Sequence, residues 1–281
     1  MTKWIATPSR TKQILADYGL HAKKGYGQNF LVDPMLVERC AQEAHASDAV
    51  IEIGPGIGSL TEQLARVAKH VTAYEVDHDL EKVLADTLSP YDNIEIIWQD
   101  FLTCDLRAKV DELKAKYGSV SVCANLPYYI TTPVLFRLFE EAPDIPYITV
   151  MVQKEVGERF AAAVNTADYG ALSVEAQTLY DVKKLFNVPA RSFNPSPNVD
   201  SVIIQFARHS EQTMDSQDLQ NFFTFVKACF RQRRKTVYNN LRDYLGSGEQ
   251  ALAVLAKAGV DQRTRAQELS TEQLRKLYEC L

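Results

Sequence analysis

Short apolar runs that end in a polar residue or a glycine recur along the first part of the chain. They occupy residues 49–53, 70–76, 94–98, 120–124 and 148–152. Segments with the apolar spacing of a helix lie between them, at residues 60–68, 80–88 and 133–141. Buried strands that alternate with helices require parallel pairing, with helices on both faces of the sheet. The pattern therefore predicts an α/β domain with a doubly wound, Rossmann-like sheet.

The pattern changes on either side of this alternating region. Residues 34–44 have helical spacing and begin with a proline, which is favourable in the first turn of a helix. Residues 202–206 predict a last strand, and strand signals stop at about residue 210. Helical spacing then covers residues 218–245, 248–258 and 271–281. We expect residues 1–207 to form the α/β domain with an N-terminal arm, and residues 208–281 to form a small all-α domain.

The composition is that of an ordinary globular protein. Of the 281 residues, 46% are apolar and 24% are charged. The five cysteines are widely spaced outside any C-x-x-C pattern and the five histidines are scattered, so we expect neither disulfides nor a metal site. The N-terminus lacks the apolar segment of a signal peptide, and no stretch reaches the roughly 18 apolar residues of a membrane span. We therefore expect a cytoplasmic protein.

Charge is unevenly distributed along the chain. The formal net charge is −5 overall, but residues 1–28 carry +4 and residues 208–281 carry +3, which leaves −12 on residues 29–207. Basic ends that flank an acidic body are able to hold a polyanion along one face. Ends that are simply solvated fit the charge pattern equally well.

A glycine turn follows the first predicted strand. Residues 52–58 read Glu-Ile-Gly-Pro-Gly-Ile-Gly. Glycines at the carboxyl end of a strand allow a ligand to approach the backbone beside a helix N-terminus, so Gly54 and Gly56 are candidate cofactor contacts. The G-x-G-x-G spacing departs from the G-x-G-x-x-G pattern that binds a pyrophosphate. A nicotinamide cofactor, and with it an oxidoreductase, is therefore disfavoured.

Three further predicted strands are each followed by one polar residue, namely Glu75, Asp100 and Asn125. Ligands of open α/β sheets bind outside the carboxyl ends of the strands, so these side chains should line one crevice with the glycine turn. An acid about 20 residues beyond such a turn is placed to accept hydrogen bonds from ribose hydroxyls, which fits Glu75. The carboxylate of Asp100 is able to accept a hydrogen bond from the exocyclic amine of adenine. Any one of the three, taken alone, fits equally well as a loop residue or a helix cap.

The segment that begins at Asn125 reads Asn-Leu-Pro-Tyr and resembles the N/D-P-P-Y/F motif of methyltransferases that modify exocyclic amines of adenine or cytosine. Such an amine is a poor nucleophile, and acceptors on both of its N–H bonds favour the tetrahedral geometry of the transition state. The side-chain oxygen of Asn125 and the carbonyl of Leu126 are suitable acceptors. Tyr128 offers an aromatic face to an unstacked base. The alternative is a β-turn with Pro127 at its second position.

Five segments together resemble the ribosomal RNA adenine N6-dimethyltransferase family over about residues 20–245. They are Gln-Asn-Phe-Leu at 28–31, the glycine turn, the Asn-Leu-Pro-Tyr segment, F-x-P-x-P-x-V-D-S at 193–201 and Phe-Arg-Gln-Arg-Arg-Lys at 230–235. The resemblance implies a class I methyltransferase fold and S-adenosyl-L-methionine as the cofactor. The implied substrate is two adjacent adenosines in a hairpin near the 3′ end of 16S rRNA, in the small (30S) ribosomal subunit.

The resemblance also implies a role for single residues. Phe193 is implied to hold the flipped target adenine against Tyr128. The implied cofactor contacts are Asn29, Leu31, Gly54, Glu75 on the ribose, Asp100 on the adenine, and Asn125 between the methionine and the target base.

A basic stripe is predicted on the 218–245 helix. It comprises Lys227, Arg231, Arg234, Lys235, Tyr238 and Arg242, opposite an apolar side. Such a stripe supplies phosphate contacts that position RNA with little sequence readout. Lys23 and Lys24, just before the segment at 28–31, are candidate second contacts. Read without the family resemblance, a solvated helix face is favoured.

Two other functions stay open. Within the same fold, the alternative is a large-subunit (23S) rRNA adenine methyltransferase of the antibiotic-resistance type, although the segments at 193–201 and 230–235 favour the small-subunit enzyme. In a different class, the alternative is a non-catalytic ribosome assembly factor, which would have lost Asn125, Tyr128 or the glycine turn. We expect a monomer, because nothing in the sequence indicates an obligate dimer.

Overall fold

The computed structural model describes residues 4–210 and 214–281, and the chain divides into two compact units. The first unit comprises Met1–Gly157 and Lys183–Arg208, and the second comprises Glu158–Val182 and His209–Leu281. The sequence pattern predicts residues 158–182 as part of the first domain, whereas their contacts group them with the C-terminal residues. The chain therefore enters the second unit, returns to the first, and leaves it again after Arg208.

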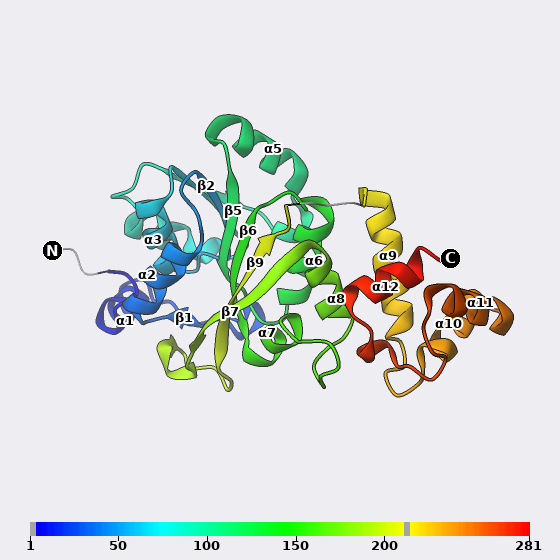
Figure 1. The fold of residues 1–281 in the computed structure, drawn as a ribbon. Coiled ribbons are helices and arrows are strands. Elements are labelled where there is room, and N and C mark those ends of the chain that lie inside the picture. Colours follow the sequence, from blue (N-terminus) through cyan, green and yellow to red (C-terminus); the bar gives the residue numbers. More distant parts are fainter. Residues whose placement is uncertain (1–3, 211–213) are drawn as a thin grey trace. The chain divides into compact units, whose positions relative to one another are not determined.

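A seven-stranded sheet in the order β4-β3-β2-β5-β6-β9-β7 forms the centre of the α/β fold (Figure 1). The strands are β2 Ala49–Ile53, β3 His70–Glu75, β4 Ile94–Trp98, β5 Val120–Asn125, β6 Tyr147–Gln153, β7 Tyr180–Val188 and β9 Ser201–Arg208. The strands β2 to β6 pair in parallel, as the alternating pattern predicts. The last predicted strand, β9, pairs antiparallel with β6. The predicted fold class is confirmed, but β7 was not expected.

Helices follow the strands and cover both faces of the sheet, with α2 and α3 on one side and α5 and α6 on the other (Figure 1). The helices of this part are α1 Pro8–Asp17, α2 Pro34–Glu43, α3 Ser59–Val67, α4 Glu81–Thr87, α5 Leu106–Tyr117, α6 Thr131–Glu141 and α7 Lys154–Phe160. The helix α2 begins where the sequence predicts, because the Asp33 side chain accepts a hydrogen bond from the Leu36 amide. The helices α1, α5 and α7 were not expected from the sequence.

Two short strands connect distant loops beside the sheet. The strand β1 (Phe30–Leu31) pairs antiparallel with β8 (Phe193–Asn194), so that Leu31 lies opposite Phe193. The amide of Val32 also donates to the carbonyl of Ser192 at 2.8 Å. Two segments that the sequence analysis singled out, about 160 residues apart in the chain, are therefore fastened side by side.

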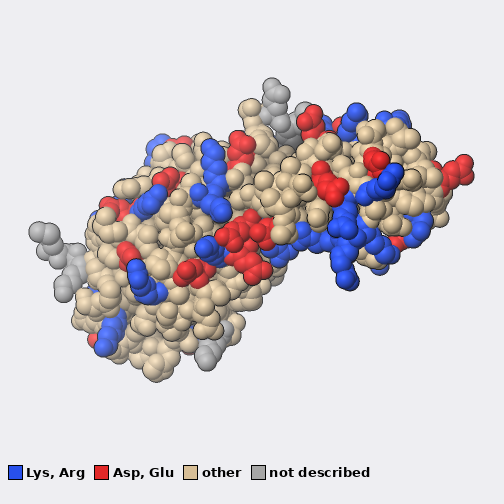
Figure 2. All heavy atoms as spheres, turned by 60° about the horizontal axis from the view of Figure 1, so that its bottom comes forward, with Lys and Arg blue, Asp and Glu red and all other residues tan. Residues whose placement is uncertain are grey.

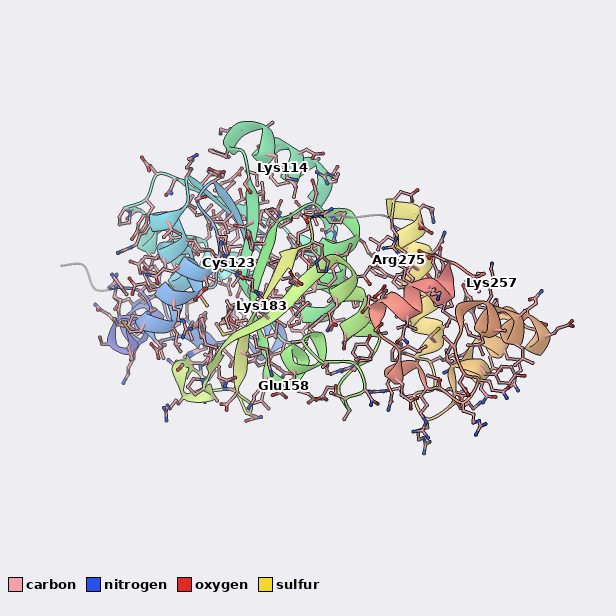
Figure 3. The ribbon with its side chains drawn as sticks, in the orientation of Figure 1. Lys114, Cys123, Glu158, Lys183, Lys257 and Arg275 are labelled. Atoms are coloured by element: carbon pink, nitrogen blue, oxygen red, sulfur yellow. The ribbon has the colours of Figure 1, made fainter. Side chains whose placement is uncertain are left out.

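Two apolar clusters connect the N-terminal residues to the rest of the α/β fold. One contains residues of the sheet and of both short strands, such as Leu31, Met151, Phe193 and Cys123, which lies on β5 (Figure 3). The other is built on α4 and the N-terminal segment; its buried members are Ile5, Ile14, Phe30, Ile57, Leu80, Val83, Leu84 and Leu88. Both clusters thus contain members from the first 31 residues of the chain.

The second unit is helical. Its helices are α8 Ala171–Leu179, α9 Ser216–Cys229, α10 Val237–Leu245, α11 Gly248–Ala258 and α12 Thr271–Tyr278. The single helix predicted over 218–245 is wrong, because a turn at 230–236 separates α9 from α10. The Thr236 side chain caps α10, and the Asn240 amide donates to the Cys229 carbonyl at the end of α9 at 2.7 Å. No helix in the described part of the chain is long and apolar enough to cross a membrane.

Candidate active site

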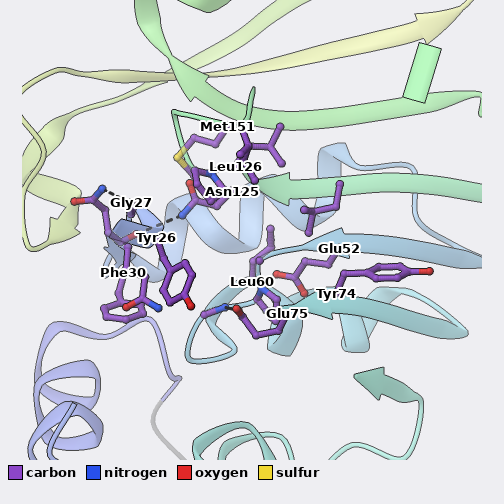
Figure 4. Close-up of a pocket in the computed structure, with 18 of the residues that line it drawn as sticks. Tyr26, Gly27, Phe30, Glu52, Leu60, Tyr74, Glu75, Asn125, Leu126 and Met151 are labelled. Carbon is purple, nitrogen blue, oxygen red and sulfur yellow. Dashed lines mark hydrogen bonds between the residues drawn. The ribbon is translucent and has the colours of Figure 1, made fainter. Parts of the chain in front are cut away.

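A pocket opens where the carboxyl ends of β2, β3 and β5 meet the segment before α2 (Figure 4). It encloses about 1110 Å³ including its mouth. The predicted cofactor and target residues that line it are Asn29, Leu31, Gly54, Gly56, Glu75, Asp100, Asn125, Leu126, Tyr128 and Phe193. The structure therefore brings all of these candidates together, from segments that span more than half of the chain.

The glycine turn presents its backbone to the pocket. Gly54 has a φ of +72° and Gly56 has a φ of +57°, a backbone conformation that residues other than glycine rarely adopt. A Cβ atom at Gly56 would lie 3.4 Å from the Phe30 ring. The turn is fixed at its start by the Gly54 amide, which donates to the Tyr74 carbonyl at 2.9 Å. A ligand is able to approach this backbone closely because no side chains intervene.

Glu75 lies at the end of β3 and is buried beside the glycine turn. One carboxylate oxygen accepts from the amides of Val76 and Asp77, both at 2.8 Å, and the other accepts from the Gly56 amide at 3.3 Å. Burial raises the pKa of this carboxyl, and the three backbone hydrogen bonds oppose that rise. The carboxylate is thus held in one orientation at the pocket wall.

Asp100 is exposed at the mouth of the pocket, and it is also a helix cap. Its Oδ1 atom accepts from the Leu102 amide at 2.8 Å, at the start of the short 3₁₀ helix η3 (Phe101–Thr103). The capping interpretation that the sequence left open is therefore correct for one oxygen. The side chain still lines the pocket.

The segment that carries Asn29 is attached to the end of β3. Lys23 Nζ lies 2.6 Å from Asp77 Oδ1 and 2.5 Å from Asp79 Oδ2, and Gln28 Nε2 donates to Asp77 Oδ2 at 2.8 Å. These hydrogen bonds raise the pKa of the Lys23 ammonium, which is already paired with two carboxylates. A phosphate would have to compete with both, which disfavours Lys23 as an RNA contact. The side chain of Lys24, the other candidate, lies outside the described part of the chain.

The Asn-Leu-Pro-Tyr segment leaves the end of β5 next to this attached segment. Asn125 Nδ2 donates to the Asn29 carbonyl at 3.4 Å, which directs Oδ1 away from that carbonyl (Figure 4). The Leu126 amide donates to the Met151 carbonyl at 3.3 Å. The Pro127 carbonyl accepts a hydrogen bond from the Ile130 amide at 3.1 Å, which closes a turn over residues 127–130. The turn therefore begins at Pro127, whereas the sequence predicts one with Pro127 at its second position.

Two aromatic residues, Tyr128 and Phe193, line the pocket beside Asn125. The Tyr128 hydroxyl forms a hydrogen bond of 2.8 Å with Ser201 Oγ, and burial raises the pKa of this phenol. Phe193 is only 4% exposed and packs in the cluster that contains Leu31 and Met151. Both rings are therefore held by the fold rather than exposed on a mobile surface.

Sequence reasoning assigned no role to some residues that line the pocket. Glu52 is 1% exposed on β2, and its Oε2 atom has no hydrogen-bond partner among the described residues. Burial raises its pKa to about 8. The available signal was a carboxylate inside an otherwise apolar strand. Tyr26 and Tyr129, at the mouth, are 39% and 59% exposed.

The predicted basic stripe is not one helix face. Arg231, Arg234 and Lys235 lie in the turn between α9 and α10 and are exposed, and Figure 2 shows Lys and Arg side chains gathered over the helical part. Lys227 belongs to α9, where its Nζ is 4.0 Å from an oxygen of buried Glu175. Arg233 is fastened to the same unit through the carbonyls of Ala167 and Tyr169, at 2.6 and 2.8 Å. Three of the predicted basic side chains, Arg231, Arg234 and Lys235, are therefore presented by a turn rather than by a helix face.

Comparison with known proteins gives a consistent answer. The family described as ribosomal RNA adenine dimethylase matches residues 19–281. "Ribosomal RNA small subunit methyltransferase A" of Bacillus licheniformis is 47% identical over 279 residues, which covers 97% of this chain and 96% of that protein. The protein of the same name from Staphylococcus aureus strain Newman is 45% identical over 283 residues, covering 99% and 95%.

Two solved structures resemble this protein over most of the chain. A dimethyladenosine transferase from Plasmodium falciparum is 26% identical with a TM-score of 0.73, covering 88% of this chain and 95% of that one. The 23S rRNA methyltransferase ErmE is 30% identical with a TM-score of 0.66, covering 90% and 99%. The fold is that of a class I methyltransferase. The chain belongs to the ribosomal RNA adenine dimethylase family, which confirms the resemblance seen in the sequence.

Proposed function

We propose that the protein transfers methyl groups from S-adenosyl-L-methionine to N6 of two adjacent adenosines near the 3′ end of 16S rRNA. The observation that carries this proposal is the position of Asn125. Its amide is oriented by Asn29 at the wall of a glycine-lined pocket, next to the rings of Tyr128 and Phe193. One cavity therefore holds three features: a hydrogen-bond acceptor for the target amine, a glycine-lined surface for the cofactor, and a slot for the base between the Tyr128 and Phe193 rings.

The residues of the pocket fit this cofactor. The side-chain-free backbone at Gly54 and Gly56 leaves room for it, and Glu75 offers a fixed carboxylate to ribose hydroxyls. The unpartnered Oε2 of Glu52, buried at the pocket wall, suits a cationic group such as the ammonium of the methionine part. Asp100, Asn29 and Leu31 would complete the contacts. When bound, the cofactor supplies a methyl group on a positively charged sulfur.

The protein's own groups would prepare the amine for attack. Tyr128 and Phe193 hold the flipped adenine between two rings, which replaces the stacking lost in the RNA. Asn125 Oδ1 and the Leu126 carbonyl each accept a hydrogen bond from one N–H group of N6. These two hydrogen bonds favour the tetrahedral amine of the transition state over the planar amine of the ground state. The methylated amine is acidic enough to lose its proton to water, so no strong base is required.

The small subunit is the substrate that the relatives favour. Relatives at 45% to 47% identity over almost the whole chain are named small-subunit rRNA methyltransferases, whereas ErmE, named a 23S rRNA methyltransferase, is 30% identical. The exposed Arg231, Arg234 and Lys235 support binding to rRNA phosphates. We propose that the protein acts as a monomer on this particle.

The test is transfer of a labelled methyl group to undermethylated 30S and 50S subunits in parallel, followed by mapping of the modified nucleotides. We expect N6,N6-dimethyladenosine at two adjacent positions of 16S rRNA. Label in 23S rRNA alone would support the resistance-type alternative. Binding to 30S subunits without transfer would support the assembly-factor alternative.

Replacing Asn125 tests the mechanism. In Asn125→Ala we expect the transfer rate to fall on the order of 100-fold or more, since one transition-state acceptor is removed. The dissociation constant of S-adenosyl-L-methionine, measured by calorimetry, should stay measurable. Unchanged turnover on 30S subunits would contradict the role of Asn125.

A further inference from the structure

Asp200 and Ser201 are adjacent residues that bond to the two segments carrying the aromatic walls of the slot. Ser201 Oγ is joined to the Tyr128 hydroxyl at 2.8 Å. Asp200 Oδ1 accepts from the Ala190 amide at 2.9 Å, at the start of the 3₁₀ helix η4 (Ala190–Ser192), which leads directly into Phe193. We propose that Asp200 and Ser201 form a bracket that sets the gap between the Tyr128 and Phe193 rings. This inference rests on the proposed function.

The bracket is anchored in the sheet. Ser201 is the first residue of β9, is fully buried, and pairs with Gln153 of β6. The Asp200 carbonyl accepts from the Lys154 amide at 3.0 Å, which fixes the backbone just before it. The strands β6 and β5 are neighbours, so the anchor of the Tyr128 hydroxyl and the segment that carries Tyr128 belong to the same sheet. The Tyr128 ring is thus tied at both ends.

The Phe193 wall is tied to Asp200 and to the cofactor side of the pocket. The Asp200 carboxylate holds the start of η4, and the Ser196 hydroxyl donates to the Ala190 carbonyl at 2.9 Å. Beyond η4, Phe193 lies opposite Leu31 in the β1–β8 pair. The bond to Asp200 is exposed to solvent, whereas Ser201 is buried, so we expect Ser201 to contribute more to the position of the walls.

The gap matters because stacking depends steeply on distance. A planar base held between two rings needs about 7 Å between their planes, twice the ~3.5 Å of carbon–carbon packing. A ring that tilts or shifts by ~1 Å stacks much more weakly on one face of the base. The hydroxyl fixes this wall: a phenylalanine would stack equally well but would have no bond to Ser201. The bracket therefore acts as a positioning device for the target adenine, and neither of its residues needs to touch the reacting atoms.

A double-mutant cycle on turnover of undermethylated 30S subunits tests the bracket. We expect Ser201→Ala and Tyr128→Phe each to lower kcat by about threefold to tenfold, as for the removal of one hydrogen bond, and the double variant to lower it no further. The dissociation constant of the cofactor should stay near that of the wild type, which a general loss of structure around Ser201 would not predict. Asp200→Ala should lower kcat by a smaller factor, and Asp200→Asn, which keeps an acceptor oxygen, should restore it.

Ser121→Ala is the matched control, since it removes another buried serine hydroxyl from the same sheet, on β5. It should leave kcat unchanged. Wild-type kcat in Ser201→Ala, or decreases that multiply in the double variant, would overturn the bracket and leave the proposed function standing. A wild-type protein that transfers no methyl group to rRNA would overturn both.

Discussion

At the scale of single residues, the buried carboxyl of Glu52 predicts how the affinity for the proposed cofactor depends on pH. Burial raises its pKa to about 8, so the carboxyl is mostly protonated at neutral pH. A cationic group bound beside it would favour the carboxylate and lower that pKa, so binding would release a proton. We therefore expect the dissociation constant of S-adenosyl-L-methionine to fall as pH rises from 6 to 8, by up to about tenfold per pH unit, and to level off above 8.

Calorimetry across this pH range checks the prediction, with Glu52→Gln as the control. The glutamine does not titrate, so the part of the pH dependence that Glu52 causes should be lost in this variant. The stability of the fold should change in the opposite direction. Because the pKa of Glu52 in the folded protein lies above its ordinary value of 4.5, its contribution to the free energy of unfolding decreases as pH rises from 4.5 towards 8. An identical pH profile for cofactor binding in both proteins would remove Glu52 from the cofactor site.

The sequence predicts those site residues whose position follows from strand ends. Glu75, Asp100 and Asn125 were found because parallel strands bring their carboxyl ends to one edge. Glu52 was missed because its charge lies inside an apolar strand, where only the pocket reveals its role. The pairing of Lys23 was missed because its partner, Asp77, is 54 residues away in the chain.

At the scale of elements, the helix α1 supports the pocket from outside the region that matches the family, which begins at residue 19. Ile14 is buried in the cluster that contains Phe30 and Ile57, and both of these line the pocket. The amide of Ile5 donates to the buried Glu62 carboxylate at 2.9 Å, which fixes the segment before α1. The N-terminal segment is therefore part of the structure that supports the pocket.

Shortening Ile14 should destabilise this support. We expect Ile14→Ala to lower the free energy of unfolding by about 2–5 kcal/mol, the usual range for a buried isoleucine, and to weaken cofactor binding through Phe30 and Ile57. Urea denaturation and calorimetry measure the two effects. Lys12→Ala, at an exposed position of the same helix, should change neither. Equal stability of both variants would show that α1 is not packed as described.

The break between α9 and α10 shows what periodicity cannot resolve. Apolar residues continue with helical spacing on both sides of residues 230–236, so the pattern alone predicts one helix. The break is set by local polar contacts, the cap at Thr236 and the bond of Asn240 to the end of α9. It moves Arg231 and Lys235 from a helix face into an exposed turn.

At the scale of the whole molecule, charge and connectivity differ in how well the sequence reveals them. The fold class follows from the alternation of strands and helices, which is a property of the entire first half. The excursion of residues 158–182 into the second unit does not, because no change in composition marks its ends. The net charge of −5 likewise hides a basic C-terminal region whose exposed arginines and lysine lie close together in one turn.

That turn predicts how RNA binding responds to salt. Changing Arg231, Arg234 and Lys235 to glutamate should weaken binding to 30S subunits and reduce the slope of log affinity against log salt by about one for each phosphate that the variant no longer neutralises. The matched control reverses three exposed charges elsewhere in the same unit, Lys257 (Figure 3), Arg263 and Lys276, for the same change in net charge. If both triple variants reduce the slope equally, the effect belongs to net charge, because a true RNA-binding surface releases fewer counterions only when phosphate-binding residues are replaced.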